Sequence, residues 1–422
     1  MEIPKIVKEH IEKNYEIIKK SRPKLAELYK NCYPNTIETA LVPQEDGSYF
    51  VLTGDIPAMW LRDSTAEVSH YIPLCHDEEV KNIIKGVIKR QFMYIAIEPY
   101  SNSFNEEANN NHYEEDIPAN DPWVWERKYE VDSLCYPFRL LYLYWKETGD
   151  NSLLDEEFIK TVKTVISLWK TEQEHMEKSP YIFIRPTDNP PCLHNNGKGN
   201  PVSYTGMTWS GFRPSDDQCT YGYLIPSNIF AVVVLGYIAE MLEAIGYDKT
   251  LIEEVNLLKE QIEEGINKFG IIDHEKYGKV YACETDGMGN HLLFDDANVP
   301  SLLSIPYLGY KNDEVYKNTR KLILSPENPY YYEGKFAKGI GSPHTPENYI
   351  WHIALSMQGL TAESKEEILE ILDMLENTDA GTGFMHEGFL ADDPNVFTRP
   401  WFSWSNSLFA EFVESALEKG IL

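Results

Sequence analysis

Apolar residues recur at the spacing of a helix along most of the chain. This period predicts helices over residues 3–30 (one amphipathic helix), from about 65 through the 90s with a break near His76-Asp77, up to about Thr148-Gly149, and over 155–176, 226–245, 248–268 and 402–418. The alternation typical of β-strands is convincing only over 36–53, with a turn at Asp46-Gly47, and is weaker over 270–283. The regular structure is therefore predicted to be nearly all helix.

Polar loops recur six times between these helices. They are rich in Trp, Arg, Asp, Glu and His, and their centres lie near residues 60, 125, 210, 292, 346 and 390. Between successive loops there is room for about two helices. Helical hairpins whose polar loops meet at one end form an (α/α)6 barrel, so we predict an all-α (α/α)6 barrel with minor β-hairpins in its loops.

The chain gives no sign of division into parts. It contains no low-complexity linker and no shift in composition, so we predict a single catalytic domain over residues 1–422. A repeat of 34–45 residues with a fixed consensus is also missing, which disfavours a helical solenoid.

Composition narrows the classes of partner. A hydrophobic content of 42% and an aromatic content of 13% indicate an ordered globular protein. A formal charge of −29 argues against nucleic acid and anionic membranes as partners. The N-terminus lacks the pattern of a signal peptide, and the longest apolar run, Ile229–Ile238, is shorter than the roughly 20 residues of a membrane span. The six cysteines are scattered and contain no CxxC pair, so we expect free thiols and a cytoplasmic protein. We also expect a monomer.

The stretch with the densest candidate chemistry is Gly206–Gln218, GMTWSGFRPSDDQ. Aromatic rings that stack on a pyranose and a carboxyl that keeps its proton in apolar surroundings are what a sugar-cleaving site requires. The alternative is a helix N-terminus at which Pro214, Ser215 and the two aspartates cap the following run. This stretch alone leaves both interpretations open.

Several other chemistries lack their motifs. The chain has no HExxH pair, no DxDxDG loop, no phosphate-binding loop and no GxSxG elbow, so we expect no metal and no cofactor. Paired carboxyl groups remain: Asp55, Asp63, Glu126, Glu130, Asp132, Asp216, Asp217 and Glu387. Hydrogen-bond donors for sugar hydroxyls are available in Arg62, Arg127, Arg213, His344 and Asn348. Each also has a structural alternative: Arg62 and Asp63 can simply pair with each other, and Glu130 or Asp132 can cap a helix.

The polar loops carry long, irregular motifs. In order they are TGDIPAMWLRDS, WERKYEVDSLCYP, GMTWSGFRPSDD, DDANVPSLL, GSPHT, and GTGFMHEGF followed by WFSWSN. In sequence and order they resemble the bacterial exo-α-1,6-mannosidases of glycoside hydrolase family 125, over residues 30 to 410. The resemblance implies an (α/α)6 barrel and a metal-independent, inverting hydrolase. The substrates it implies are non-reducing terminal α-1,6-linked mannosides, such as trimmed N-glycan fragments.

The resemblance also implies roles for particular residues. The first aspartate of PSDD, Asp216, would be the general acid, and the glutamate of MHE, Glu387, the general base. The spacing does not separate Asp216 from Asp217. The residues expected to hold the terminal mannose are Arg62, Asp63, Glu130, Asp132, Arg213 and His344.

Two further expectations concern the surroundings of the acid. A guanidinium close to a carboxyl favours its ionised form, so we expect Arg213 to face Asp217 or a sugar hydroxyl. The long polar loop over residues 98–124 is a candidate wall for a blind pocket. Two alternatives to this function are another (α/α)6 glycoside hydrolase or phosphorylase, and a non-catalytic sugar-binding helical protein.

Overall fold

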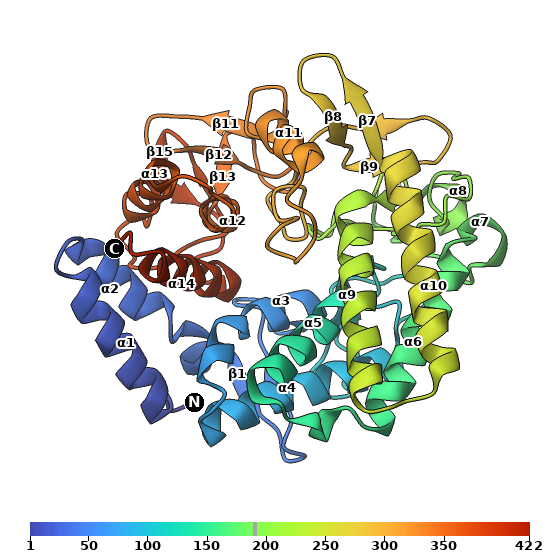
Figure 1. Cartoon of the computed structure of the whole chain (residues 1–422), viewed down its shortest axis with the longest axis horizontal. Helices are drawn as coiled ribbons and strands as arrows, with labels where there is room; N and C mark the ends of the chain where they lie inside the picture. Colours follow the sequence, from blue (N-terminus) through green and yellow to red (C-terminus); the bar gives the residue numbers. More distant parts are fainter. Residues whose placement is uncertain (189–191) are drawn as a thin grey trace.

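The computed structural model describes residues 1–188 and 192–422. Its helices form a ring of inner and outer members around a common centre (Figure 1). The helices are α1 Lys5–Ile18, α2 Pro23–Cys32, α3 Leu61–Ala66, α4 Glu78–Ile97, α5 Val131–Thr148, α6 Glu156–Glu172, α7 His175–Lys178, α8 His194–Gly197, α9 Ile225–Ala244, α10 Lys249–Gly265, α11 Glu314–Ile323, α12 His352–Leu360, α13 Lys365–Glu376 and α14 Ser403–Glu418. This arrangement is the predicted (α/α)6 barrel.

Packing defines the two layers. On the inner side α3 packs against α5, α5 against α9, α12 against α14, and α14 against α3. On the outer side α4, α10, α13 and α2 pack against α5, α9, α12 and α14 (Figure 1). Contacts of α2 with α14 and α13 join the first and last hairpins, so the ring is closed without a covalent link.

Helix α9 shows how deep the inner layer lies. By length and by a mean hydropathy of 1.7 it could cross a membrane, but 83% of that stretch is buried inside the protein. It packs against α5 on one side and α10 on another. These observations identify α9 as a core helix of the ring, because an apolar surface on all sides suits a helix surrounded by protein.

Residues 303–309 form successive turns between α9 and α12, where another inner helix would stand (Figure 1). The buried carboxylate of Asp295 accepts hydrogen bonds from the backbone N–H groups of Leu302 at 2.7 Å and Leu303 at 3.0 Å. The ring therefore keeps its inner wall at this position with a capped irregular segment.

Short strands make small antiparallel sheets in the loops. They are β1 Leu41–Pro43, β2 Tyr49–Val51, β3 Met59–Trp60, β4 Ser103–Phe104, β5 Val124–Glu126, β6 Tyr223–Leu224, β7 Ile271–His274, β8 Gly278–Tyr281, β9 Glu284–Thr285, β10 His291–Leu292, β11 Tyr331–Glu333, β12 Lys338–Ile340, β13 Tyr349–Trp351, β14 Gly388–Leu390 and β15 Asp393–Phe397. The three-stranded sheets have the orders β3-β4-β5, β10-β9-β6 and β13-β14-β15. Strands β3, β6 and β13 run directly into the inner helices α3, α9 and α12, so these sheets hold the N-terminal ends of the inner layer.

Most of the predicted local elements are confirmed. β1 and β2 form the predicted hairpin over 41–51, and in its turn Asp46 accepts the N–H of Ser48 at 2.8 Å while Gly47 has φ 78°. The predicted start of this segment is wrong, because Thr36–Ala40 forms a π-helical turn. The break near residue 76 is also present, because Asp77 caps α4 through the N–H groups of Glu79 and Val80. Strands β7 and β8 form the second predicted β segment.

The single helix over residues 3–30 is wrong. The chain forms α1 and α2 instead, and the N–H groups of Ser21 and Arg22 bond back to the carbonyl of Ile18 in the turn between them. Pro23 stands at the start of α2, where its missing N–H costs nothing. The apolar period continues through the turn, so the period alone did not reveal the break.

Candidate active site

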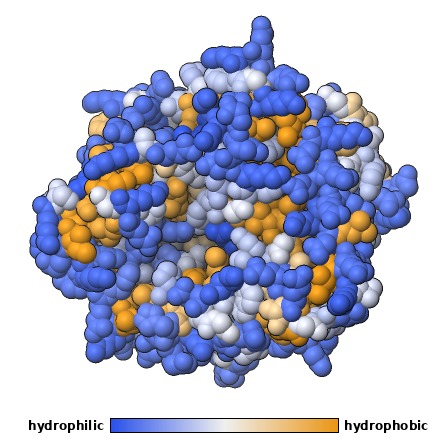
Figure 2. Space-filling model, viewed as in Figure 1, coloured by the Kyte–Doolittle hydropathy of each residue, from blue (hydrophilic) through white to orange (hydrophobic). Residues whose placement is uncertain are grey.

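A cavity of about 290 Å³ opens where the polar loops meet at the N-terminal ends of the inner helices. Figure 2, viewed as in Figure 1, shows the surface hollowed near its centre. The lining residues are Thr53, Ile56, Trp60, Arg62, Asp63, Pro214, Ser215, Asp216, Asn298, His344, Trp351, Glu387, Arg399 and Phe402. Five of the six predicted loops thus contribute lining residues, and the loop near 125 lies directly behind them.

Asp216 is presented by a tight hairpin loop. An isolated bridge pairs Phe212 with Gln218, and the N–H of Arg213 donates to the carbonyl of Asp217 at 2.8 Å. Asp216 itself has φ 65°, in the left-handed region that Asp and Asn tolerate better than most other residues. The loop is tied to the start of α5, because the N–H groups of Gly211 and Phe212 both donate to the carbonyl of Tyr129.

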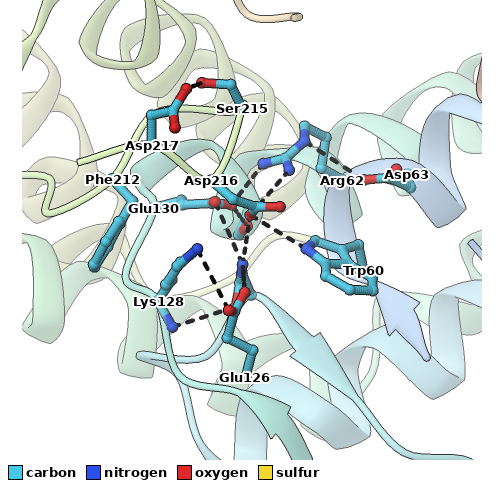
Figure 3. Close-up of polar contacts among 12 residues, drawn as sticks. Trp60, Arg62, Asp63, Glu126, Lys128, Glu130, Phe212, Ser215, Asp216 and Asp217 are labelled. Atoms are coloured by element: carbon cyan, nitrogen blue, oxygen red, sulfur yellow. Dashed lines mark hydrogen bonds and ion pairs between the residues drawn. The ribbon is translucent and has the colours of Figure 1, made fainter. Parts of the chain in front are cut away.

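The surroundings of Asp216 are charged, which the sequence did not predict. Its carboxylate accepts hydrogen bonds from Asn102 Nδ2 at 2.9 Å and Trp60 Nε1 at 3.4 Å, and Arg62 lies 3.8 Å away (Figure 3). Burial acts to raise the pKa of Asp216, but Lys128 and Arg62 outweigh it and lower that pKa below its usual value. The expectation that an apolar pocket keeps a proton on this carboxyl is therefore wrong in its physical cause.

The neighbouring Asp217 has a different environment. It is not among the lining residues, and its carboxylate accepts from Ser215 Oγ at 3.1 Å and lies 3.6 Å from His344 Nδ1. The next long helix, α9, begins only at Ile225, and its N-terminal residue Leu224 is not an aspartate. The capping interpretation of this stretch is wrong, and the hairpin loop distinguishes Asp216 from Asp217 by their positions.

Arg62 lies at the centre of a buried group that we call the arginine cluster: Arg62, Asp63, Glu130 and Asp132. Arg62 contacts Glu130 at 2.5 Å, Asp132 at 3.1 Å and Asp63 at 3.5 Å (Figure 3). The side chains of Glu130 and Asp132 are 0% exposed. Neither carboxylate caps α5, since Glu130 makes no side-chain cap bond and Asp132 accepts from Ser227 Oγ at 3.1 Å. The cluster therefore fixes the guanidinium at the cavity wall.

Glu130 lies next to Asp216, since the carboxyl groups of both contact Asn102 Nδ2 and Arg62. It also accepts from Ser133 Oγ at 2.8 Å and lies 3.4 Å from Asn102 Nδ2. Burial raises the pKa of Glu130 well above its usual value, against the opposing effect of Arg62. The two carboxyl groups therefore differ in proton affinity, with the proton favoured on Glu130.

Glu387 lies directly before β14, in a loop far along the chain from Asp216. Its backbone carbonyl accepts from the N–H of His352 at 3.3 Å, which ties it to the beginning of α12. Arg399 Nη1 lies 3.8 Å from Glu387 Oε1. Arg399 also donates to Asp55 Oδ1 at 2.8 Å and to the carbonyl of Thr53 at 2.7 Å, which links the last loop to the first.

His344 reaches the cavity from the loop before β13. Its side chain is 43% exposed, and the Asp217 carboxylate 3.6 Å away raises its pKa to about 9 against the effect of burial, with Asp216 and Glu387 acting in the same direction as Asp217. The imidazole is therefore a cation at neutral pH, beside both candidate catalytic carboxyl groups.

Arg213 points away from the cavity. Its Nε donates to Glu284 Oε1 at 2.6 Å, and its guanidinium lies 4.8 Å from the ring of Phe294. The expectation that it faces Asp217 or a sugar hydroxyl is wrong, because the fully buried Glu284 of β9 pairs with it and Arg213 does not line the cavity. Arg213 holds the hairpin loop to the neighbouring sheet.

Of the residues that the sequence nominated, Asp216, Glu387, Arg62, Asp63 and His344 line one cavity. Glu130, Asp132 and Arg213 do not, and they lie behind its wall. Residues 98–124 likewise do not line it, although Asn102 of that loop bonds to Asp216. Lining residues that were not singled out include Trp60, Asn298, Trp351, Arg399 and Phe402. Trp60, Asn298 and Phe402 stand within the loop motifs, whereas Trp351 and Arg399 lie outside them.

Comparison with known proteins gives consistent relatives. The sequence profile described as metal-independent α-mannosidase (GH125) matches residues 22–414. The meiotically up-regulated gene 157 protein of Schizosaccharomyces pombe is 41% identical over 421 residues, covering 94% of this chain and 82% of that protein. A solved Streptococcus pneumoniae structure, described among metal-independent α-mannosidases in relation to the processing of N-linked glycans, is a non-productive substrate complex with α-1,6-mannobiose. It is 49% identical, with a TM-score of 0.96 over 99% of both chains.

More distant structures share only the fold. A bacterial glucoamylase complexed with acarbose has a TM-score of 0.57 at 13% identity, over 93% of this chain and 55% of that one. This likeness supports the (α/α)6 architecture and carries no information on the substrate.

Proposed function

Because this chain belongs to the GH125 family of metal-independent α-mannosidases, we propose that it removes terminal α-1,6-linked mannose from oligosaccharides with inversion at C1. The observation that carries the proposal is the presence of Asp216 and Glu387 in one cavity of about 290 Å³. They come from loops far apart in the chain, and an inverting glycosidase needs two carboxyl groups on opposite sides of the scissile bond.

The reaction is a single displacement. Asp216 protonates the glycosidic oxygen as the C1–O bond breaks, and Glu387 removes a proton from a water that attacks C1 from the opposite face. The two carboxyl groups must then stand roughly 6.5–9.5 Å apart in the substrate complex to leave room for that water. Arg399, 3.8 Å from Glu387, orients the base.

The remaining lining residues hold the sugar. Arg62, Asp63 and His344 offer charged partners for mannose hydroxyls, and Asn298 has a buried amide nitrogen without a protein partner among the described residues. Trp60, Trp351 and Phe402 supply aromatic walls, the usual surface for a pyranose face. Glu130 and Asp132 act indirectly by fixing Arg62, and Arg213 by fixing the hairpin loop.

The substrate class follows from the relatives and the cavity together. The Streptococcus pneumoniae relative was captured with α-1,6-mannobiose, and the cavity volume suits a single terminal sugar better than a long chain. We therefore propose exo action on α-1,6-linked mannose of N-glycan fragments. Incubation with α-1,2-, α-1,3- and α-1,6-linked mannobioses, each with and without phosphate, tests linkage and separates hydrolysis from phosphorolysis.

Proton NMR of the first-formed sugar tests the stereochemistry. Inversion predicts β-mannose as the initial product, and initial α-mannose would overturn the proposal. The variants Asp216→Asn and Glu387→Gln test the roles, and each should lower kcat on α-1,6-mannobiose by about 10²–10⁴-fold. Near-wild-type turnover in either variant would show that another group carries that step.

A further inference from the structure

The arginine cluster and its surroundings hold more acid than base. Six buried or nearly buried carboxyl groups and three cations lie in two adjoining sets: Arg62 pairs with Asp63, Glu130, Asp132 and Asp216, while Lys128 and Arg185 pair with Glu126 and Arg185 also with Asp116. Asn102 joins the two sets, because its side-chain nitrogen contacts Glu126, Glu130 and Asp216. His344 adds a positive charge from the cavity side, but Asp217 is its own partner. An uncompensated buried carboxylate is costly, so groups in such a cluster retain protons.

The contacts within the cluster identify the pair of carboxyl groups, Glu130 and Asp216, at which a retained proton can serve the reaction. Glu130 and Asp216 share two partners: Asn102 Nδ2 lies 3.4 Å from Glu130 and 2.9 Å from Asp216, and Arg62 contacts both carboxyl groups. The side chain of Glu130 is 0% exposed, whereas that of Asp216 is 25% exposed, toward the cavity. One carboxyl of the pair is thus sealed in protein and the other faces the cavity, and Figure 3 shows the two side chains close together.

The proposed function leaves a difficulty that this pair resolves. A general acid must carry a proton at the working pH, yet Lys128 and Arg62 lower the pKa of Asp216. Two adjacent carboxyl groups cannot both ionise easily, so the pair as a whole keeps one proton longer than Asp216 alone would. The same cations then become an advantage, because they stabilise the charge left after the proton has been given away.

We propose that Glu130 and Asp216 hold a single proton between them, so that Glu130 is the positioning residue that keeps Asp216 able to protonate the substrate. The inference rests on the proposed role of Asp216 as the acid and adds a partner for it. In the resting enzyme the proton lies on Glu130, and Asp216 is ionised toward Lys128 and Arg62.

One proton passes through the pair in each turnover. When the glycosidic oxygen approaches Asp216, the proton passes from Glu130 to Asp216 and from there to that oxygen. The electron pair of the breaking C1–O bond stays on the oxygen, which becomes the hydroxyl of the leaving sugar. Glu130 and Asp216 are left as two carboxylates, and Glu387 holds the proton of the attacking water. Release of that proton to solvent, and uptake of another at Asp216 that then passes to Glu130, restore the resting state.

The test compares Glu130→Gln with the wild type in the pH dependence of kcat/KM. One substrate is α-1,6-mannobiose, which needs an acid, and the other is 2,4-dinitrophenyl α-mannoside, whose leaving group departs without a proton. A glutamine cannot share a proton, so the basic limb for mannobiose should move at least one pH unit toward acid, with about a 100-fold loss at pH 7. The dinitrophenyl substrate should lose less than about fivefold.

A matched control is Glu172→Gln, which removes another fully buried carboxylate, one that accepts from Tyr100 and Ser179 outside the cavity. It should leave both pH profiles in place. If Glu130→Gln lowers kcat/KM equally on both substrates and the basic limb for mannobiose does not move, Glu130 only supports Arg62. That result would overturn the inference. An unchanged Glu130→Gln would overturn it as well.

The variant Asp216→Asn separates a failure of the acid assignment from a failure of the shared proton. If it retains activity on mannobiose, the assignment of the acid fails, and if it loses activity while Glu130→Gln keeps the wild-type profile, only the shared proton fails. Should Glu130→Gln not fold, infrared difference spectra of wild type against Asp216→Asn at neutral pH decide. Loss of one protonated-carboxyl band in the variant supports sharing, because Glu130 then ionises toward Arg62, and an unchanged band refutes it.

Discussion

Replacing Arg62 with methionine would remove the central cation of the arginine cluster while keeping an unbranched apolar stem. The side chain is 3% exposed, and its guanidinium contacts four carboxylates at 2.5, 3.1, 3.5 and 3.8 Å. Because the substitution leaves these carboxylates buried without their shared partner, the folded state bears a desolvation cost that the ion pairs had offset.

The expected loss of stability follows from the usual cost of breaking a buried ion pair and from the usual unfolding entropy per residue. Removing one partner of a buried ion pair costs about 3–5 kcal/mol. Unfolding entropy of roughly 2.1 cal/mol/K per residue gives about 0.9 kcal/mol/K for a chain of this length. The melting temperature of Arg62→Met at pH 7.5 should therefore fall by about 3–6 °C.

The loss should also depend on pH. Burial raises the pKa of Asp63 to about 6 even with Arg62 present, and that of Glu130 well above its usual value. Without Arg62 these values rise further, so the folded variant binds more protons than its unfolded chain over an interval extending above pH 6. Stability falls with rising pH wherever the folded state binds more protons. The deficit against wild type should thus be smaller at pH 5 than at pH 7.5.

Thermal scans by circular dichroism at pH 5.0 and 7.5 measure both quantities. The matched control is Arg90→Met, since buried Arg90 donates to the hydroxyl of Tyr94 at 2.8 Å and to the carbonyl of Glu106. The control should lose stability by a similar amount at both pH values. A pH-independent deficit in Arg62→Met, or a melting temperature equal to that of wild type, would refute this account of the cluster.

Three other expectations follow from the structure. The imidazolium of His344, with its pKa raised to about 9, should lose its charge as the pH rises through 9, so the alkaline fall in kcat/KM on mannobiose between pH 8 and 10 should be weaker in His344→Gln; identical profiles would contradict this. In Gly222→Ala the new Cβ would lie 2.0 Å from Trp209 Nε1, so differential scanning fluorimetry should show a fall of about 1–3 °C, whereas Gly236→Ala, with open space around it, should show none; equal shifts would contradict the packing argument. Dialysis against EDTA should leave mannobiose turnover unchanged, and activity restored by added divalent cations would contradict a metal-free mechanism.

Local signals in the sequence predicted the fold well. The Asp46-Gly47 turn and the end of α5, where Gly149 adopts φ 66°, depend on the conformational freedom of single residues, so they can be predicted without knowledge of the rest of the chain. The split between α1 and α2 could not be predicted from the period, because apolar spacing continues across it. Packing of α2 against α14 and α13 favours that split, and it involves residues at the far end of the chain.

The candidate site shows more clearly that local motifs can be predicted from the sequence and contacts between distant residues cannot. Motifs nominated Asp216 and Glu387, and both line the cavity. The electrostatic setting of Asp216 was predicted wrongly, because its sequence neighbour Arg213 turns away to Glu284 while Arg62 and Lys128 approach from distant loops. Ionisation depends on neighbours in space, and a barrel assembles those neighbours from every hairpin.

The closure of the ring has a consequence for synthesis of the protein. The cavity draws on residues from Thr53 to Phe402, and Arg399 bonds to Asp55 across that whole interval. At a translation rate of about 5–20 residues per second, the last of these segments emerges roughly 20–70 s after the first. During that time the apolar inner side of α9 has no complete ring to cover it. The growing chain must therefore pass through an inactive stage with exposed core surface, and catalytic competence arrives only when the final hairpin docks.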